Sequence, residues 1–202
     1  MFAIIQASGW PIWPLLLASV IAVALIIERS MALRRSRIVP ETLLEQVVGD
    51  VRGRGVTPAM VSSVAAHSPL GRVLAAGLRN MNSSREVMKE AIEETGRAVA
   101  HELERYLTTL GTIAAISPLM GLFGTIVGMI EIFSAQGVSG ANPAQLARGI
   151  SIALNTTGLG LIIAIPATIF WRHFRALVDS FVIEMEQQAI RLVDVVHGER
   201  RN

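Results

Sequence analysis

The chain of 202 residues contains no cysteine, and only 17% of its residues are charged. The absence of cysteine excludes a disulfide framework and a metal site built from thiolates. Charged residues make up about 25% of an average soluble domain, so this chain has few of them. Hydrophobic residues reach 51%. This composition predicts a membrane protein.

The basic residues do not form a cluster of the kind that binds nucleic acid. The formal net charge is only +2, and the arginines are scattered along the chain without interleaved aromatic residues. We therefore expect no nucleic acid partner. The sequence also lacks the alternating pattern of strands, internal repeats and low-complexity tracts, and this favours an all-α fold.

No motif of an enzyme is complete. His101-Glu-Leu-Glu-Arg lacks the second histidine of a zinc-protease helix, and the glycine-rich segment 121–128 lacks the lysine and preceding strand of a phosphate loop. Serine, histidine and aspartate occur, but no spacing places them together. We expect no catalytic residue, no metal and no cofactor.

Hydrophobic residues gather in three segments, each close to the roughly 20 residues that cross a bilayer as a helix. We predict transmembrane helices at 10–28, 109–134 and 149–171. The alternative for the first segment is a cleaved signal peptide. Such a peptide begins with basic residues, whereas residues 1–27 contain no Lys or Arg.

The positions of the basic residues predict the orientation in the membrane, because cytoplasmic segments carry more Lys and Arg. Arg29, Arg34, Arg35 and Arg37 follow the first span, whereas Arg148 is the basic residue of the segment between spans two and three. All of the 18 basic residues except Arg148 then lie on the cytoplasmic side of the membrane. The predicted order is a periplasmic N-terminus (1–9), a cytoplasmic helical domain (29–108), a periplasmic loop (135–148) and a cytoplasmic C-terminal helix (172–202).

Prolines and capping residues predict the helices outside the membrane. Pro40, Pro58 and Pro69 suit the first position of a helix, and Thr57 and Ser68 are suitable caps. These signals predict short helices at 40–52, 58–66 and 69–81.

Two longer helices are expected to cross the membrane and continue beyond it. A capping box of Ser83 and Glu86 begins the first, predicted from 84 to about 134. Asn142 and Pro143 begin the second, which runs through the third span to about residue 197. The apolar residues of its last part recur at helical spacing, so they pack either on residues 84–110 of the same chain or on another copy. These residues are Phe174, Leu177, Val178, Phe181, Met185, Ala189, Leu192 and Val196.

Spans two and three carry small and polar residues that a simple anchor does not need. Ser117, Gly121, Thr125 and Gly128 share a helix face. Gly124 and Gly128 form a GxxxG pair, which allows helices to approach closely.

In the third span, Ser151, Asn155 and Gly158 share a face, and the run Asn155-Thr156-Thr157 lies at mid-span. Polar residues at this depth avoid lipid. They either bond between helices or line a path for ions or water.

The same two segments resemble a known family. Residues 117–129, from Ser117-Pro-Leu-Met to Gly128-Met, resemble the second-span motif of the MotA/TolQ/ExbB proton channel family. Residues 149–166, from Gly149-Ile-Ser to Ala-Ile-Pro166, resemble its third-span motif. The similarity covers nearly the whole chain and is greatest to ExbB, with TolQ close behind.

This resemblance implies a homo-oligomer, a pentamer, around an ExbD-like or TolR-like single-span partner in the lipid membrane. Proton flow past an Asp of the partner then drives a TonB-like energy transducer and outer-membrane transport, or the Tol-Pal envelope system. The resemblance places Thr125 and Thr157 beside that Asp. The full set predicted to line the path is Ser117, Thr125, Asn155, Thr156 and Thr157, and the residues predicted to pack helices are Gly121, Gly124, Gly128, Gly158 and Gly160.

One residue departs from the motif of ExbB and TolQ, because Ile152 stands where those proteins usually have Glu. An isoleucine cannot carry a proton. Either the path relies on the partner's Asp with hydroxyl groups and water, or the chain is a membrane scaffold that does not conduct.

Overall fold

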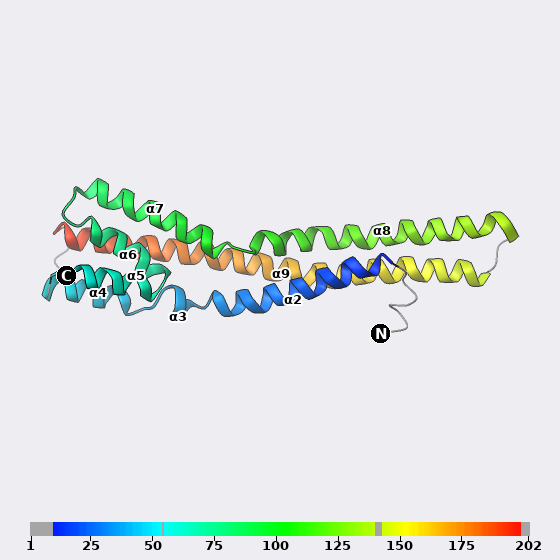
Figure 1. Cartoon of the computed structure of the whole chain (residues 1–202), viewed down its shortest axis with the longest axis horizontal. Coiled ribbons are helices and arrows are strands. Elements are labelled where there is room, and N and C mark those ends of the chain that lie inside the picture. Colours follow the sequence, from blue (N-terminus) through cyan, green and yellow to red (C-terminus); the bar gives the residue numbers. More distant parts are fainter. Residues whose placement is uncertain (1–9, 54, 140–142, 199–202) are drawn as a thin grey trace. The chain divides into compact units, whose positions relative to one another are not determined.

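The computed structural model describes residues 10–53, 55–139 and 143–198, with the backbone alone at 135–139 and 145. Every regular element in these ranges is a helix (Figure 1). The prediction of an all-α protein is therefore confirmed for the described part of the chain. The helices are α2 (Ile12–Ala32), α3 (Arg35–Ile38), α4 (Leu43–Gly53), α5 (Pro58–His67), α6 (Pro69–Arg79), α7 (Arg85–Leu103), α8 (Leu107–Ser139) and α9 (Pro143–Val196).

The chain divides into two compact units. The span unit comprises residues 1–29 and 106–173, and the bundle unit comprises residues 30–105 and 174–202. Helix α9 belongs to both, because it continues without interruption from Pro143 to Val196.

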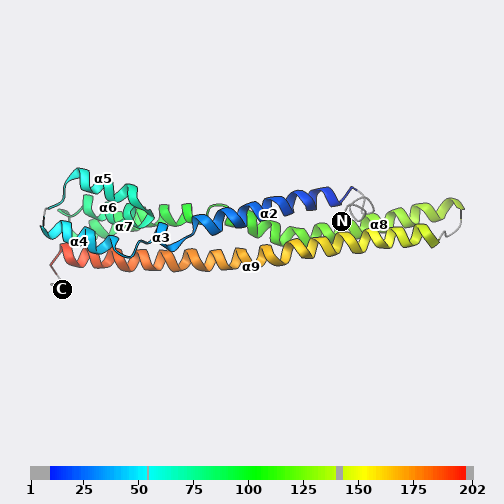
Figure 2. The same ribbon diagram turned by 90° about the horizontal axis from the view of Figure 1, so that it is seen from below.

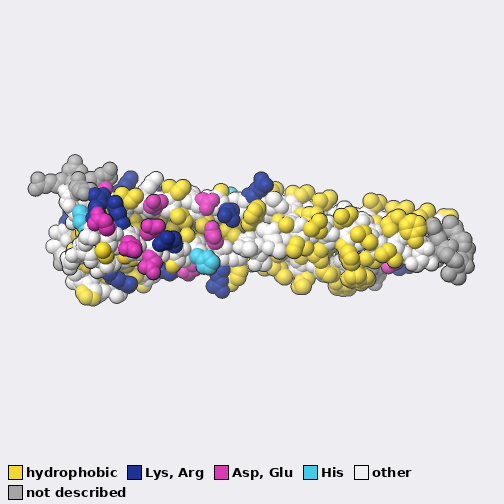
Figure 3. All heavy atoms as spheres, turned by 90° about the horizontal axis from the view of Figure 1, so that it is seen from above, with side chains coloured by type: hydrophobic (Ala, Val, Ile, Leu, Met, Phe, Trp, Pro, Cys, Tyr) yellow, Lys and Arg dark blue, Asp and Glu magenta, His cyan; other side chains and the backbone are white. Residues whose placement is uncertain are grey.

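The span unit contains α2, α8 and the first part of α9, and each of these helices is long and apolar enough to cross a membrane. Trp10, just before α2, contacts Phe123 of α8, and the two rings meet edge to face with their centroids 5.8 Å apart. Large aliphatic side chains remain exposed, among them Val20, Leu119 and Leu154. Figure 3 shows hydrophobic side chains gathered over this unit. Such a surface suits a hydrocarbon environment.

The caps of the bundle unit follow the sequence signals closely. Thr57 accepts a hydrogen bond from the amide of Met60 at 3.3 Å, and Ser68 accepts one from the amide of Gly71 at 3.0 Å. Pro58 and Pro69 are the first residues of α5 and α6, as predicted. Pro40 does not begin a helix, because α4 starts at Leu43.

The cap of α7 was predicted one residue too early. Ser84, rather than Ser83, accepts the hydrogen bond from the amide of Val87, at 3.4 Å. The capping box of Ser83 and Glu86 is therefore wrong.

The C-terminal part of α9 packs within the same chain. Arg35 contacts Glu184 at 2.8 Å, and Arg85 of α7 contacts Asp194 at 2.9 Å. This result answers the question left open between packing in the chain and packing on another copy. Six of the predicted apolar residues are buried here: Phe174, Val178, Phe181, Met185, Ala189 and Leu192.

The long helix predicted from 84 to about 134 is interrupted. Helix α7 ends at Leu103 and α8 begins at Leu107. Tyr106 between them has a φ of +66°, a left-handed conformation that a continuous α-helix does not contain. Its ring lies 5.2 Å from the guanidinium carbon of Arg29, a cation–π contact within the span unit. By contrast, Pro118 and Pro166 lie inside α8 and α9 without ending them.

Candidate functional site

Helices α8 and α9 of the span unit lie side by side along a line of buried residues, which we call the seam (Figure 2). The buried residues of α8 recur every three or four positions, the spacing that keeps one helix face against its neighbour. From Leu110 onward they are Leu110, Ala114, Ser117, Gly121, Gly124, Gly128 and Ile132.

Glycine allows the two backbones of the seam to come closer than other residues would permit. A Cβ atom on Gly121 would lie 3.0 Å from the carbonyl oxygen of Thr156. One on Gly160 would lie 2.6 Å from the carbonyl oxygen of Ser117, and one on Gly128 would lie 2.8 Å from that of Gly149. These distances are below van der Waals contact, so any larger residue would push the helices apart.

Two of the predicted path residues lie inside the seam. Thr156 is fully buried against Gly124, and its hydroxyl donates to the carbonyl oxygens of Ile152 and Ala153 at 2.9 and 3.1 Å. Ser117 is also buried and donates to the carbonyl of Ile113 at 2.7 Å. Both hydroxyls are therefore satisfied within their own helices.

Thr157 and Thr125 mark one flank of the seam. The Thr157 hydroxyl crosses from α9 to α8 and donates to the carbonyl oxygen of Gly121 at 3.2 Å. Thr125 lies one turn after Gly121, is half-buried, and donates to the carbonyl of Leu122 at 2.6 Å. Each hydroxyl oxygen retains lone pairs that can accept a hydrogen bond from a partner. We call this side the threonine flank.

Asn155 points to the opposite flank. Successive residues of an α-helix are rotated by about 100°, so Asn155 and Thr157 diverge to either side of the buried Thr156. The Asn155 amide donates to the hydroxyl of Ser151 at 3.2 Å. A Cβ atom on Gly158 would meet nothing within 4 Å, so this glycine takes no part in the seam. The five predicted path residues are therefore divided between the seam, the threonine flank and the opposite flank.

The parts of α8 and α9 around the threonine flank supply hydroxyl groups but no ionisable side chain. Segments 110–130 and 149–171 contain no Asp, Glu, His, Lys or Arg. Glu131 follows the first of these segments and is exposed. Ile152 is 2% exposed in the seam, where its side chain packs and exchanges no proton.

Several residues of the seam were not predicted from the sequence. A Cβ atom on Gly149 would lie 3.0 Å from the carbonyl oxygen of Gly128, and one on Gly111 would lie 2.8 Å from Nε1 of Trp171. Small residues recur at helical spacing at positions 149, 153, 156 and 160 of α9, and this pattern could have indicated the contact of Gly149 with Gly128. No local pattern indicates the second, because Gly111 and Trp171 are distant in the sequence.

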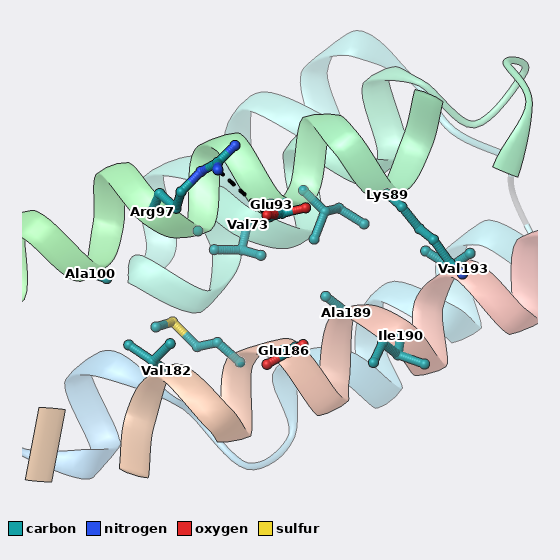
Figure 4. Close-up of a pocket in the computed structure, with 13 residues that line it drawn as sticks. Val73, Lys89, Glu93, Arg97, Ala100, Val182, Glu186, Ala189, Ile190 and Val193 are labelled. Atoms are coloured by element: carbon teal, nitrogen blue, oxygen red, sulfur yellow. Dashed lines mark ion pairs between the residues drawn. The ribbon is translucent and has the colours of Figure 1, made fainter. Parts of the chain in front are cut away.

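The bundle unit contains a separate cavity of about 520 Å³ between α6, α7 and α9 (Figure 4). Its lining is mostly aliphatic, with charged residues at the edge: Lys89, Glu93, Arg97 and Glu186. Arg97 and Glu93 pair at 3.5 Å on α7. Among the described residues no group of three or more His, Asp or Glu side chains could hold a metal.

Comparison with known proteins gives consistent matches. Residues 65–187 match the model of the MotA/TolQ/ExbB proton channel family. The chain is 32% identical over 193 residues to ExbB-like biopolymer transport protein 3 of Synechocystis sp., covering 90% of this chain and 89% of that protein. It is 30% identical to biopolymer transport protein exbB1 of Vibrio cholerae, with 80% and 73% covered, and 30% identical to ExbB of Aquifex aeolicus, with 62% and 80% covered.

Proposed function

The chain belongs to the MotA/TolQ/ExbB proton channel family, and we propose that it is the ExbB-like subunit of a proton-driven motor in the bacterial inner membrane. Its role is to couple the proton motive force to TonB-dependent transport across the outer membrane. The TolQ-like role in envelope maintenance is the second candidate, since the α8 and α9 motifs suit both.

The threonine flank carries this proposal. Thr125 and Thr157 are hydroxyl groups within an apolar layer that contains no ionisable residue of this chain. A hydroxyl can donate or accept a hydrogen bond, so it can position a carboxyl group or a water molecule without a buried charge of its own. The proton carrier is then the Asp of an ExbD-like or TolR-like single-span helix that lies against this flank.

The buried Ile152 is compatible with a proton carrier that the partner supplies. The hydroxyl groups of this chain orient the partner's carboxyl group, and the carboxyl group exchanges the proton. Ile152 contributes to the seam that holds Thr157 in place. Several copies of the chain, a pentamer by family resemblance, surround the partner with their threonine flanks inward.

The proposed topology follows the basic residues. The bundle unit, with its many arginines, lies in the cytoplasm, and the segment between α8 and α9 lies in the periplasm. A TonB-like transducer is then reached through the partner's periplasmic part.

The test compares Thr157→Val with Thr168→Val in vesicles that contain the chain and the proteins that co-purify with it. Thr168 is a matched control, because its hydroxyl bonds only the carbonyl of Ala164 in its own helix, at 2.8 Å. We expect Thr157→Val to reduce proton flux about tenfold to a hundredfold, the effect of losing a hydrogen bond of about 1.5 to 3 kcal/mol to a charged group. Thr168→Val should leave the flux unchanged.

Mass spectrometry of the same preparation identifies the partner. An ExbD-like protein with a TonB-like protein supports nutrient uptake, and a TolR-like protein supports the Tol system. Recovery of the chain alone, together with unchanged flux in Thr157→Val, would contradict the motor and favour a scaffold.

A further inference from the structure

The cavity of the bundle unit is a groove between two helices that run in opposite directions. One wall is α7 from Lys89 to Ala100, and the other is α9 from Val182 to Val193, with Val73 of α6 between them. Lys89 lies at the same end as Val193, and Ala100 lies at the same end as Val182 (Figure 4). Each wall is about 16 Å long at 1.5 Å per residue. This length matches about three turns of a further helix.

Small and aliphatic side chains line the middle of the groove. Gly96 lies on the wall of α7, and Ala189 lies on the wall of α9. A Cβ atom on Gly96 would meet nothing within 4 Å among the described residues, so the space beside it is open. At the edge, Ile190 is 45% exposed, and Ile183, two turns earlier on α9, is 55% exposed. Exposed apolar side chains bordered by charged residues are typical of surfaces that bind another protein.

The edges of the groove carry one cation and one anion that are available to a partner. Lys89 and Glu186 are exposed, and neither forms an ion pair or a side-chain hydrogen bond with any described residue. Arg97 and Glu93, by contrast, pair with each other at 3.5 Å. Glu186 precedes Val193 by seven residues, so it lies about 10 Å along α9 from the Lys89 end. The groove therefore presents a positive charge at one end and a negative charge two turns away.

We propose that this groove binds an amphipathic helix of another protein, with an acidic residue in its first turn and a basic residue two turns later. The apolar side chains of that helix, spaced three or four residues apart, enter between α7 and α9. Its acidic residue pairs with Lys89, and its basic residue pairs with Glu186. This order of charges also suits the dipole of the bound helix, whose N-terminus then lies at the Lys89 end. The inference goes beyond the proposed function, because it concerns a surface outside the span unit.

The charges and the open side of the groove favour a helix over an acyl chain. An acyl chain offers no positive charge to Glu186, and its hydrocarbon would stay exposed to water along the open side. A helix can bury one apolar face in the groove and keep its polar face in water.

The first experiment uses two synthetic helical peptides as probes on the full chain in detergent micelles. The first peptide has leucines on one face, Glu in its first turn, Lys seven residues later, and benzoylphenylalanine among the leucines. The second has the same composition with Glu and Lys exchanged. Mass spectrometry then maps the residues that each peptide labels on irradiation, at a peptide concentration below saturation.

We expect the first peptide to label the groove about threefold to tenfold more than the second, because exposed ion pairs have modest energies. The double variant Lys89→Glu with Glu186→Lys should reverse this preference. Equal labelling by the two peptides, or labelling mainly outside the groove, would overturn the inference.

A matched pair of glycine variants tests whether the groove itself is the site. Gly96 lies in the groove, and Gly49 lies on α4 outside its lining. A Cβ atom at either position would meet nothing within 4 Å, so the described chain accommodates a larger residue at both. Gly96→Leu fills the groove and should abolish labelling by the first peptide, whereas Gly49→Leu should retain it. Labelling that persists in Gly96→Leu would refute the assignment.

The last experiment identifies what occupies the groove in the cell. Benzoylphenylalanine replaces Ile190 in the full chain in its native membrane, and mass spectrometry reads the sequence of the captured segment. Capture of a helical segment with the predicted order of apolar, acidic and basic residues supports the inference. An adduct of two copies of this chain, lipid adducts alone, or a segment without this pattern would overturn it.

Discussion

Gly124→Ala should push the two helices of the seam apart. The resulting loss in the free energy of unfolding can be estimated from the contact of position 124 with Thr156. The added Cβ atom would lie 2.5 Å from the Cβ and 2.9 Å from the Cγ2 of Thr156. Carbon atoms pack at about 3.5 to 4.0 Å, so the helices must move apart by about 1 Å. Overpacking of this kind costs about 1 to 3 kcal/mol in the free energy of unfolding.

The side chain of Thr156 supplies all of the nearest atoms, so its removal should restore the space. Thr156→Gly alone should destabilise the chain by about 2 kcal/mol, through the glycine in the helix and the lost methyl group. In that background, Gly124→Ala should add no further cost, which gives a favourable coupling of about 1 to 3 kcal/mol in a double-mutant cycle. The assay is SDS titration of the purified chain in detergent micelles, followed by tryptophan fluorescence.

Two controls make the result specific. Gly158→Ala should be neutral or stabilising by up to about 1 kcal/mol, because its Cβ meets no described atom and alanine favours a helix. Gly128→Ala should stay destabilising in the Thr156→Gly background, because its Cβ meets the backbone oxygen of Gly149. If Gly124→Ala behaved like Gly158→Ala, the close packing of α8 on α9 would be refuted.

Two further predictions concern the joint between α7 and α8 and the packing of the α9 tail. Tyr106→Gly should be more stable than Tyr106→Ala by about 1 kcal/mol, because glycine tolerates the positive φ and both variants lose the ring beside Arg29. The reverse order in SDS titration would indicate a continuous helix at this position. Asp194→Asn should cost about 1 kcal/mol, because its ion pair with Arg85 is largely shielded from water, with exposed fractions of 14% and 30%. Glu93→Gln, whose pair with Arg97 is about 70% exposed on both sides, should cost almost nothing in the same assay.

The sequence by itself determined the features that depend on neighbouring residues. Apolar runs of sufficient length predicted three helices able to span a membrane, and Thr57-Pro58 and Ser68-Pro69 predicted the starts of α5 and α6. A cap or a first-turn proline acts within one turn of helix, so its effect is readable from a few consecutive residues. The choice of Ser83 over Ser84 failed because adjacent serines offer nearly the same local chemistry.

The break at Tyr106 had no local signal. The segment around it contains neither glycine nor proline, and a tyrosine with positive φ is unfavourable in isolation. The contact of its ring with Arg29, distant in the sequence, is one of the tertiary interactions at this position. Local propensity therefore favoured a continuous helix that the folded chain does not have.

Only the tertiary structure decided what the polar residues of the third span face. Asn155, Thr156 and Thr157 are consecutive, and their sequence gives no reason to separate them. Once Gly124 brings α8 against Thr156, the rotation of the helix directs Thr157 to the carbonyl of Gly121 and Asn155 to the other side. The sequence sets the relative angles of the three side chains, and the position of the neighbouring helix sets which of them is buried, which crosses the seam and which faces away from α8.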